Sequence, residues 1–273
     1  MRQSSVDLKS SGRSIGFVPT MGALHGGHVS LINEAKKCND AAVLSIFVNP
    51  TQFAPGEDYN SYPRDIERDK ITASDTGVDI LFLPSADEMY PEGFKTFVNV
   101  EGITESLCGR FRPRHFKGVA TVVLKLFNIV MPDRAYFGEK DYQQLLVVKK
   151  MVKDLNLDIE IKGMPTIREW DGLAMSSRNG YLNRKERISA VSLSTALKTS
   201  QEMVKNDERR AEKIIGEMEK VINNEDAAKI DYISICDPDT LKDIEIIDNR
   251  ALAALAVRIG KTRLIDNCIL EVK

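Results

Sequence analysis

The side chains best suited to chemistry are gathered in one short stretch, Pro19–His28. It holds two of the three histidines of the chain, His25 and His28, with glycines beside and between them. The stretch lies at an expected helix start, which leaves backbone N–H groups unpaired and carries the positive end of the helix dipole. Such a turn favours phosphate, and two imidazoles add donors to it. The pattern therefore indicates a nucleotide-binding turn.

Two other interpretations of the paired histidines stay open at this point. By spacing alone, two solvated loop histidines are the commonest outcome. A zinc site is the second alternative, but Glu does not follow His25 as the His-Glu-x-x-His pattern requires, and no other histidine or paired cysteine stands nearby. Placement favours the nucleotide interpretation, because β-prone residues 14–18 precede the turn and residues 29–38 carry a helical pattern.

The first part of the chain has the pattern of a doubly wound α/β sheet. Residues 41–48 form a nearly continuous apolar run, which is typical of a parallel strand buried on both faces. Pro63 opens a helix that reaches about Ser74, and residues 78–83 predict a third buried strand. Strands that alternate with helices predict right-handed crossovers and a parallel sheet. Ligands bind at the carboxyl ends of such strands, where both the histidine turn and the polar stretch 49–53 lie.

A second turn repeats this geometry. A long apolar helix is expected over residues 118–131, a short strand over 135–137, and a helix over 142–154, with a further strand near 158–161. Between the short strand and the following helix stand Gly138, Glu139, Lys140 and Asp141. The alternative for Lys140 is the commonest one for any lysine, a solvent-exposed position at the surface. Its place after a strand and a glycine favours a phosphate contact.

The pattern changes after about Arg168. Residues 175–179 form a polar loop with two hydroxyls and an arginine, able to close over a phosphate chain. The later elements are two amphipathic helices, 184–206 and 208–224, and three strands, 230–236, 251–258 and 262–270. Strands without a long helix between the last two predict an antiparallel sheet. We therefore expect a Rossmann-like domain over 1–167 and a smaller α+β domain over 168–273.

Composition narrows the function classes. The chain has 273 residues, 42% of them hydrophobic, and a net charge of −2, which supports a real core and does not suggest general nucleic-acid or membrane binding. No apolar run reaches the ~20 residues of a membrane span, and the N-terminal residues lack the apolar centre of a signal peptide. Four scattered cysteines fit reduced thiols and the cytoplasm. The glycine fingerprints of nicotinamide and Walker-type sites are absent, which argues against both.

Several motifs, in order and at proper spacing, resemble the pantoate–β-alanine ligase family, within the wider His-x-Gly-His nucleotidyltransferase superfamily. They are Pro19–His28, Asn49–Phe53, Tyr62–Arg64, Phe116–Val119 through Lys125–Ile129, Phe137–Asp141 with Gln143–Gln144, Pro165–Arg168, Asp171–Asn179 and Thr262–Asn267. The resemblance runs from about Ile15 to the end. Two departures stand out: Gly27 replaces a residue that is often Glu in relatives, and Arg114 replaces a frequent Gly.

The resemblance implies an ATP-dependent ligase that joins pantoate to β-alanine through a pantoyl adenylate, releasing AMP and pyrophosphate. It assigns ATP binding to Met21, Gly22, Ala23, Leu24, His25, Gly26, Gly27, His28, Gly138, Glu139, Lys140, Asp141, Ile167, Met175, Ser176, Ser177 and Arg178. His25, His28, Lys140 and Arg178 are the expected catalytic groups, and Gln52 and Gln144 the expected substrate-binding amides. The resemblance assigns no certain protein metal ligand: Mg²⁺ would be bound mainly through ATP, with Asp141 as a nearby protein oxygen. The resemblance also implies a homodimer.

Two alternatives belong to other function classes. A nucleotidylyltransferase that moves AMP onto a phosphorylated acceptor shares the histidine turn, but it needs a basic acceptor pocket in place of the neutral Gln52 and Gln144. A non-catalytic nucleotide sensor needs neither substrate amides nor a closing loop. A tRNA-charging role is disfavoured, because no anticodon-binding domain or basic surface is evident. The basic stretch 110–116 is either a solvated turn or a wall that meets anionic substrate.

Overall fold

The computed structural model describes residues 1–272, which divide into two compact units. Unit 1 gathers Met1–Glu101, Arg112–Glu139 and Gln144–Ile167. Unit 2 gathers Gly102–Phe111, Lys140–Gln143 and the chain from Arg168 onward. The polypeptide therefore leaves unit 1 twice, briefly, before its final departure after Ile167.

Unit 1 is built on a parallel sheet of five strands in the order β3-β2-β1-β4-β5, as the alternating pattern predicted. The strands are β1 (Ile15–Thr20), β2 (Ala41–Ile46), β3 (Ile80–Phe82), β4 (Arg134–Gly138) and β5 (Glu160–Met164). The chain order reverses between β1 and β4, which pair in parallel through Gly16 and Arg134. The carboxyl ends of strands beside such a reversal are where doubly wound sheets bind ligands.

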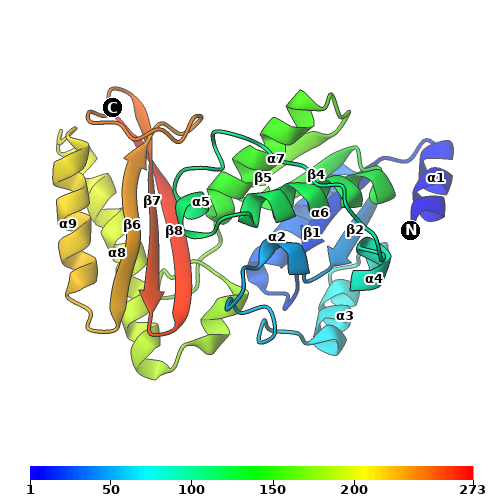
Figure 1. Ribbon diagram of the computed structural model, residues 1–273, viewed down its shortest axis with the longest axis horizontal. Coiled ribbons are helices and arrows are strands. Elements are labelled where there is room, and N and C mark those ends of the chain that lie inside the picture. Colours follow the sequence, from blue (N-terminus) through cyan, green and yellow to red (C-terminus); the bar gives the residue numbers. More distant parts are fainter. Residues whose placement is uncertain (273) are drawn as a thin grey trace. The chain divides into compact units, whose positions relative to one another are not determined.

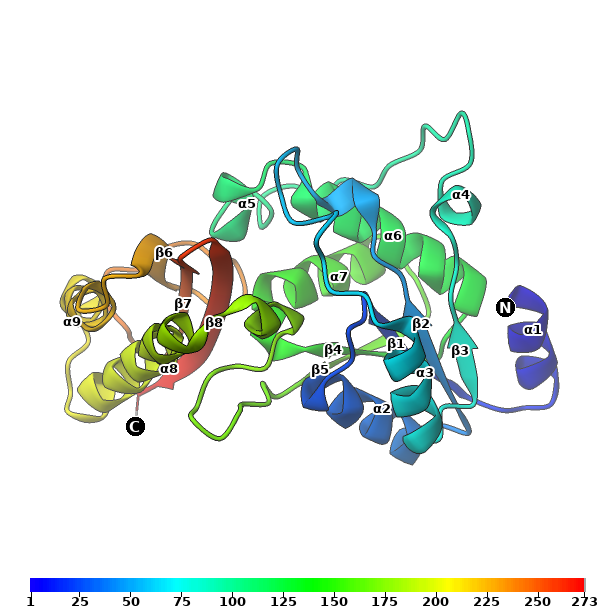
Figure 2. The ribbon, with the colours of Figure 1, turned by 90° about the horizontal axis from the view of Figure 1, so that it is seen from below.

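Helices cover both faces of this sheet. They are α2 (Gly26–Cys38), α3 (Ile66–Asp75), α6 (His115–Val130) and α7 (Tyr142–Asp154), with a short α4 (Ala86–Met89). Figure 2 shows α2 and α3 on one face and α6 and α7 on the other. The two-sided cover explains why β1 and β2 are apolar and almost wholly buried. The turns after β1 and after β4 therefore start from a rigid sheet that helices cover on both faces.

Two sequence expectations within unit 1 are wrong in detail. The strand expected over 78–83 is confined to Ile80–Phe82 and is only half-buried, because it lies at the edge of the sheet. The helix expected from Pro63 begins at Ile66, because the Asp65 side chain accepts a hydrogen bond from Arg68 N at 3.1 Å and caps the helix there.

The N-terminal helix α1 (Arg2–Ser10) was not predicted, because its sequence is polar. It is tied to the sheet through Asp133, whose carboxylate accepts from Lys9 Nζ at 2.9 Å and from Ile15 N at 2.7 Å. Burial raises the pKa of Asp133, but these two donors outweigh it and hold that pKa below its usual value. The same carboxylate therefore fixes the start of β1.

Unit 2 is an α+β layer with an antiparallel sheet, as predicted. Its strands are β6 (Ala228–Cys236), β7 (Arg250–Ile259) and β8 (Thr262–Glu271), and its long helices are α8 (Arg184–Lys205) and α9 (Ala211–Asn223). Both helices pack on one face of this sheet around Leu193, Ile214 and Met218 (Figure 1). Among residues 1–272, no helix combines the length and hydrophobicity needed to cross a membrane.

A glycine in α6 lets this helix approach the loop after β2 closely. A Cβ on Gly118 would lie 2.5 Å from Thr51 O and 2.7 Å from Gln52 Cα, both backbone atoms. Gly118 O also accepts from Asn49 Nδ2 at 3.2 Å. The position of Gln52, a candidate substrate-binding residue, therefore depends on residue 118 being a glycine, which has no Cβ.

We predict that Gly118→Ala lowers the free energy of unfolding by about 1–3 kcal/mol, since the new methyl group overpacks against backbone that cannot rotate away. The matched control is Gly216→Ala in α9, where a Cβ meets nothing within 4 Å. That change should raise stability by about 0.5–1 kcal/mol through helix propensity. Urea unfolding of the three proteins measures both effects, and equal stability of Gly118→Ala and the parent would contradict the close approach.

Candidate active site

The turn between β1 and α2 is organised by a reciprocal cap. His25 Nδ1 accepts a hydrogen bond from Gly27 N at 3.1 Å, and His28 Nδ1 accepts from His25 N at 3.3 Å. The two rings lie face to face, with centroids 4.0 Å apart and planes 33° from parallel. Two imidazoles thus do the work that Ser and Glu do in the common capping box.

The cap determines which nitrogen of each ring carries the proton. A nitrogen that accepts a hydrogen bond is unprotonated, so a neutral ring keeps its hydrogen on Nε2. Both rings therefore have Nε2–H as a donor directed away from the backbone they cap. Two backbone N–H groups of the turn, His25 N and Gly27 N, are already bonded within it. That the turn holds phosphate stays a prediction.

A buried carboxylate supports the turn from below. Asp69 of α3 is 2% exposed, and its Oδ1 accepts from Leu24 N at 2.6 Å. Gly22 has φ +72°, and a Cβ there would lie 2.6 Å from Asp69 Oδ2, so glycine is required on both counts. Burial raises the pKa of Asp69, with the Leu24 N–H opposing that rise. Sequence analysis missed Asp69; its signal is an acid on the same helix face as buried Ala73.

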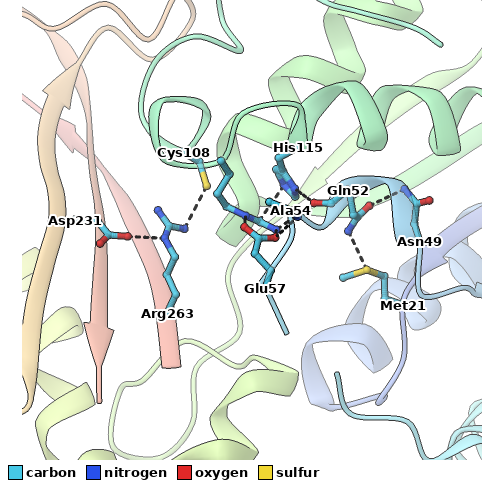
Figure 3. A network of polar contacts seen from close by, with 10 residues as sticks. Met21, Asn49, Gln52, Ala54, Glu57, Cys108, His115, Asp231 and Arg263 are labelled. Carbon is cyan, nitrogen blue, oxygen red and sulfur yellow. Dashed lines mark hydrogen bonds and ion pairs between the residues drawn. The ribbon is translucent and has the colours of Figure 1, made fainter. Parts of the chain in front are cut away.

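Gln52 lies beside this turn and is held firmly (Figure 3). Its Nε2 donates to the Met21 sulfur at 2.9 Å, and its Oε1 accepts from Asn49 Nδ2 at 3.1 Å. Only 8% of Gln52 is exposed, so it is not an ordinary surface amide. The loop after β2 and the histidine turn after β1 are thereby linked inside unit 1.

The backbone of Gln52 is fixed by residues of the basic stretch. Its carbonyl oxygen is 2.9 Å from His115 Nδ1 and accepts from Arg112 Nη2 at 3.3 Å. Arg112 also pairs with Glu57 at 2.7 Å, and although burial raises the pKa of Glu57, Arg112 holds it below its usual value (Figure 3). Arg110, by contrast, belongs to unit 2 and is largely exposed. Within the stretch 110–116, Arg112 and His115 thus support the backbone of Gln52, whereas Arg110 is exposed to solvent.

The turn after β4 begins with Gly138 and continues as a 3₁₀ turn, η2 (Glu139–Asp141). Lys140 is not the ordinary surface lysine of the alternative interpretation, because its side chain is only 17% exposed. Its Nζ lies 3.7 Å from Asp141 Oδ2, and its carbonyl oxygen accepts from Asn267 Nδ2 of β8 at 2.9 Å. The motif over Thr262–Asn267 therefore anchors the backbone that carries Lys140.

The polar loop over Met175–Arg178 lies in unit 2 and is half-buried. Ser176 Oγ accepts from Arg178 N at 3.3 Å and starts another 3₁₀ turn, η3 (Ser177–Tyr181). Ile167, the last residue of unit 1, is 37% exposed, and Gln144 is half-buried in the first turn of α7.

The structure distributes the predicted residues between the two units. Unit 1 holds the turn Met21–His28, Gln52, Gly138, Glu139, Gln144 and Ile167; unit 2 holds Lys140, Asp141, Met175, Ser176, Ser177 and Arg178. Within residues 1–272 there is no cluster of three or more His, Cys, Asp or Glu side chains that would hold a metal ion. The arrangement in unit 1 offers neutral N–H donors and amides, which suit an anionic substrate better than a bound metal.

Comparison with known proteins identifies the family. The family model for pantoate-β-alanine ligase matches residues 1–269. The pantothenate synthetase of Caldicellulosiruptor bescii is 57% identical over 273 residues, covering 100% of this chain and 97% of its own, and that of Acetivibrio thermocellus is 58% identical over 264 residues, covering 97% and 94%.

Solved structures agree with this match. The pantothenate synthetase of Thermus thermophilus superposes with a TM-score of 0.93 at 47% identity, covering 97% of this chain and 96% of its own. The pantoate-β-alanine ligase of Francisella tularensis, solved in complex with β-γ ATP and β-alanine, gives a TM-score of 0.80 at 38% identity, covering 97% and 94%. With a family model that matches residues 1–269 and relatives matched over 94–97% of their own length, the chain belongs to the pantoate–β-alanine ligase family.

Proposed function

We propose that this protein condenses pantoate with β-alanine at the expense of ATP, giving pantothenate, AMP and pyrophosphate through a pantoyl-adenylate intermediate. Family membership supports the overall reaction, and the Francisella relative was solved with β-γ ATP and β-alanine. The observation that carries the proposal is the reciprocal cap, in which His25 and His28 each direct an Nε2–H donor away from the backbone.

In the first half-reaction a carboxylate oxygen of pantoate attacks the α-phosphorus of ATP. The bond from that phosphorus to the bridging oxygen breaks, and pyrophosphate leaves with the electron pair. The nucleophile is already ionised, so no strong base is required; the difficulty is negative charge building on the leaving group. Preorganised donors lower such a barrier most effectively. We assign this task to the Nε2–H groups of His25 and His28.

Two cations complete the assignment for ATP. We propose that residues 138–141 and 175–178 hold ATP, with Lys140 and Arg178 as the cations at the phosphates, and that Ile167 presents its backbone to adenine. Asp141 is the carboxylate that would contact Mg²⁺, which would supply positive charge to neutralise the phosphates. One carboxylate is enough for this role, because Mg²⁺ commonly takes one or two carboxylates and completes its shell with phosphate and water.

In the second half-reaction the amine nitrogen of β-alanine attacks the acyl carbon. The bond from that carbon to the AMP oxygen breaks, and the nitrogen loses a proton to solvent. We propose that Gln52 and Gln144 orient pantoate in both steps, since an amide can donate to a carboxylate or hydroxyl without adding charge. Gln52 is suited to this role because five partner groups already fix its side chain and backbone, counting the Met21 sulfur, Asn49, His115, Arg112 and the Gly118 approach.

Three broader proposals accompany this reaction. Residues 1–167 would bind ATP and pantoate, and residues 168–273 would close over them. The active form would be a homodimer, as the family resemblance implies. The reaction would take place in the cytoplasm, which suits the four free cysteines.

The reaction itself is tested by incubating the protein with ATP, Mg²⁺ and pantoate, with and without β-alanine. We expect pyrophosphate to appear only when pantoate is present, and AMP with pantothenate only when β-alanine is added. Transfer of AMP to a phosphorylated acceptor, with no pantothenate formed, would instead identify a nucleotidylyltransferase and refute the proposal.

We predict that His28→Ala reduces the adenylation rate by ~10²-fold or more, because it removes one preorganised donor to the leaving group. The same change should lower stability by about 0.5–2 kcal/mol, since α2 loses half of its cap. His28→Glu separates the two roles: it restores a capping acceptor but supplies no N–H. Stopped-flow pyrophosphate release and thermal unfolding should therefore show recovered stability without recovered rate; a fast, well-folded His28→Ala protein would remove His28 from the mechanism.

We predict that Gln52→Ala slows both half-reactions by about 10-fold to 100-fold, because pantoate and its adenylate lose an orienting amide. ATP affinity, measured by titration calorimetry without pantoate, should stay close to that of the parent. Gln3→Ala is the control, since Gln3 is an exposed amide of α1 that pairs only locally with Asp7. Normal pantoate use by Gln52→Ala, or a selective loss of ATP binding, would place the acyl pocket elsewhere.

A further inference from the structure

Arg187, near the start of α8, binds side chains on both sides of one tight turn in unit 2, residues 169–173. Its Nη2 is 2.8 Å from Glu169 Oε2, while its Nε and Nη2 lie 2.9 and 2.7 Å from Asp171 Oδ2. The turn is narrow, since Glu169 N donates to Leu173 O at 2.8 Å and Gly172 N donates to Glu169 O at 2.9 Å. One guanidinium thus fixes the two acids that flank the tip of the turn.

The base of this turn is anchored independently. Arg168 pairs with Asp266 of β8 at 2.6 and 3.1 Å, and it also donates to Gly172 O at 3.1 Å. Asp266 is almost completely buried, so this pair fixes the base firmly. Arg187 therefore adds to this anchor the contacts that hold the two acids beside the tip, Glu169 and Asp171.

The tip holds the polar loop. The second oxygen of Glu169, Oε1, accepts from Asn179 Nδ2 at 2.7 Å, and the same amide donates to Ala174 O at 3.0 Å. Asn179 N also bonds to Ser176 O at 3.0 Å. One amide thus joins the two ends of the segment 174–179 and ties them to Glu169. The four residues between those ends, Met175–Arg178, form a closed loop. Asn179 closes this loop through its hydrogen bonds to Ala174 and Glu169, and Arg187 holds Glu169 in place.

The charges of this cluster agree with a permanent brace, defined as the ion pairs of Arg187 with Glu169 and Asp171. Hydrogen bonding from Arg187 holds the pKa of Glu169 below its usual value. Burial raises the pKa of Asp171, but Arg187 and the Leu173 N–H outweigh it and leave that pKa lowered as well. All three side chains are largely shielded, with 25%, 26% and 11% exposed for Arg187, Glu169 and Asp171. The ion pairs therefore persist across the neutral pH range.

We propose that Arg187 is a positioning residue for ATP: acting through Glu169 and Asn179, it holds the loop Met175–Arg178 in the shape that presents its hydroxyls and Arg178 to the phosphates. The proposal rests on the proposed function of that loop. In this role Arg187 itself does not touch substrate. Its contribution is preorganisation, which matters because a loop that must be ordered during binding weakens affinity for its ligand.

The chain carries its own reporter for the brace. Trp170, the only tryptophan, lies at the tip between the two acids that Arg187 holds, and it is 95% exposed. Because no other tryptophan contributes, the fluorescence anisotropy of the protein follows the local motion of this turn. The brace can therefore be measured without ATP and without activity.

The experiment compares Arg187→Met, Arg187→Lys and Glu169→Gln with the parent protein. The control is Arg210→Met, which removes an arginine whose Nε and Nη2 bind Glu208 at 3.0 and 3.1 Å, away from the loop in sequence and contacts. For each protein, the ligand-free anisotropy decay of Trp170, thermal unfolding, and the two half-reactions are measured, the second with pantoyl adenylate supplied.

In Arg187→Met we expect faster local motion of Trp170 and a rise of about 10-fold to 100-fold in KM for ATP, with kcat of the β-alanine step close to normal. Arg187→Lys should fall between Arg187→Met and the parent, since an ammonium cannot span both acids as a guanidinium does. Arg210→Met should match the parent in all measurements.

Failure of the proposed function and failure of the positioning role of Arg187 give different results. If the parent releases no pyrophosphate from ATP and pantoate, the proposed function fails, whatever the anisotropy shows. If the parent is active and Arg187→Met leaves either Trp170 motion or KM for ATP unchanged, the positioning role is overturned. Should Arg187→Met fold poorly, Glu169→Gln and Arg187→Lys decide the question, and equal losses in both half-reactions in these variants would indicate a general structural role instead.

Discussion

The reciprocal cap of α2 by His25 and His28 is the interaction on which the candidate site depends. Each ring gives its acceptor nitrogen to the backbone, so the proton, the ring plane and the direction of Nε2–H are set together. A helix start normally offers backbone N–H groups to an anion. Here side chains take two of those groups and replace them with donors that reach further from the helix. The imidazoles proposed to act on ATP are therefore also the structural supports of the turn.

That arrangement needs a rigid base, and buried polar contacts supply it. Asp69 receives Leu24 N from below, while Thr20 Oγ1 accepts from Gly22 N at 3.3 Å and donates to Ser45 O at 2.8 Å. These contacts replace the water that the turn would otherwise bind, and they leave little freedom for the backbone. On the other side, Met21 contacts Gln52, so the candidate nucleotide turn and the candidate acyl site share one fixed frame within unit 1.

Sequence reasoning located elements with strong periodicity and missed contacts made over long separations. The helix expected over 142–154 has the same limits in the structure, and both sheets have the expected strand directions. The polar helix α1 gave no such signal. Nor could Asp69 be paired with Leu24, 45 positions earlier, or Arg187 with the turn at Trp170, because neither pairing follows a period of the chain. The motifs named the chemical groups of the site; the ligand contacts assigned to them stay predictions.

The two brief departures of the chain from unit 1 bear on how this architecture could be inherited. Cys108 Sγ accepts from Arg263 Nη1 at 3.3 Å, and Asp231 in turn binds Arg263 at 2.7 Å (Figure 3). Asn267 Nδ2 donates to the carbonyl oxygen of Lys140. Each departing segment thus finds its partners in strands encoded much later. A gene cut after Ile167 would separate them, leaving the 102–111 and 140–143 segments without their supports. The two units are interleaved in sequence, so exchange of one between relatives by a single recombination would transfer neither intact.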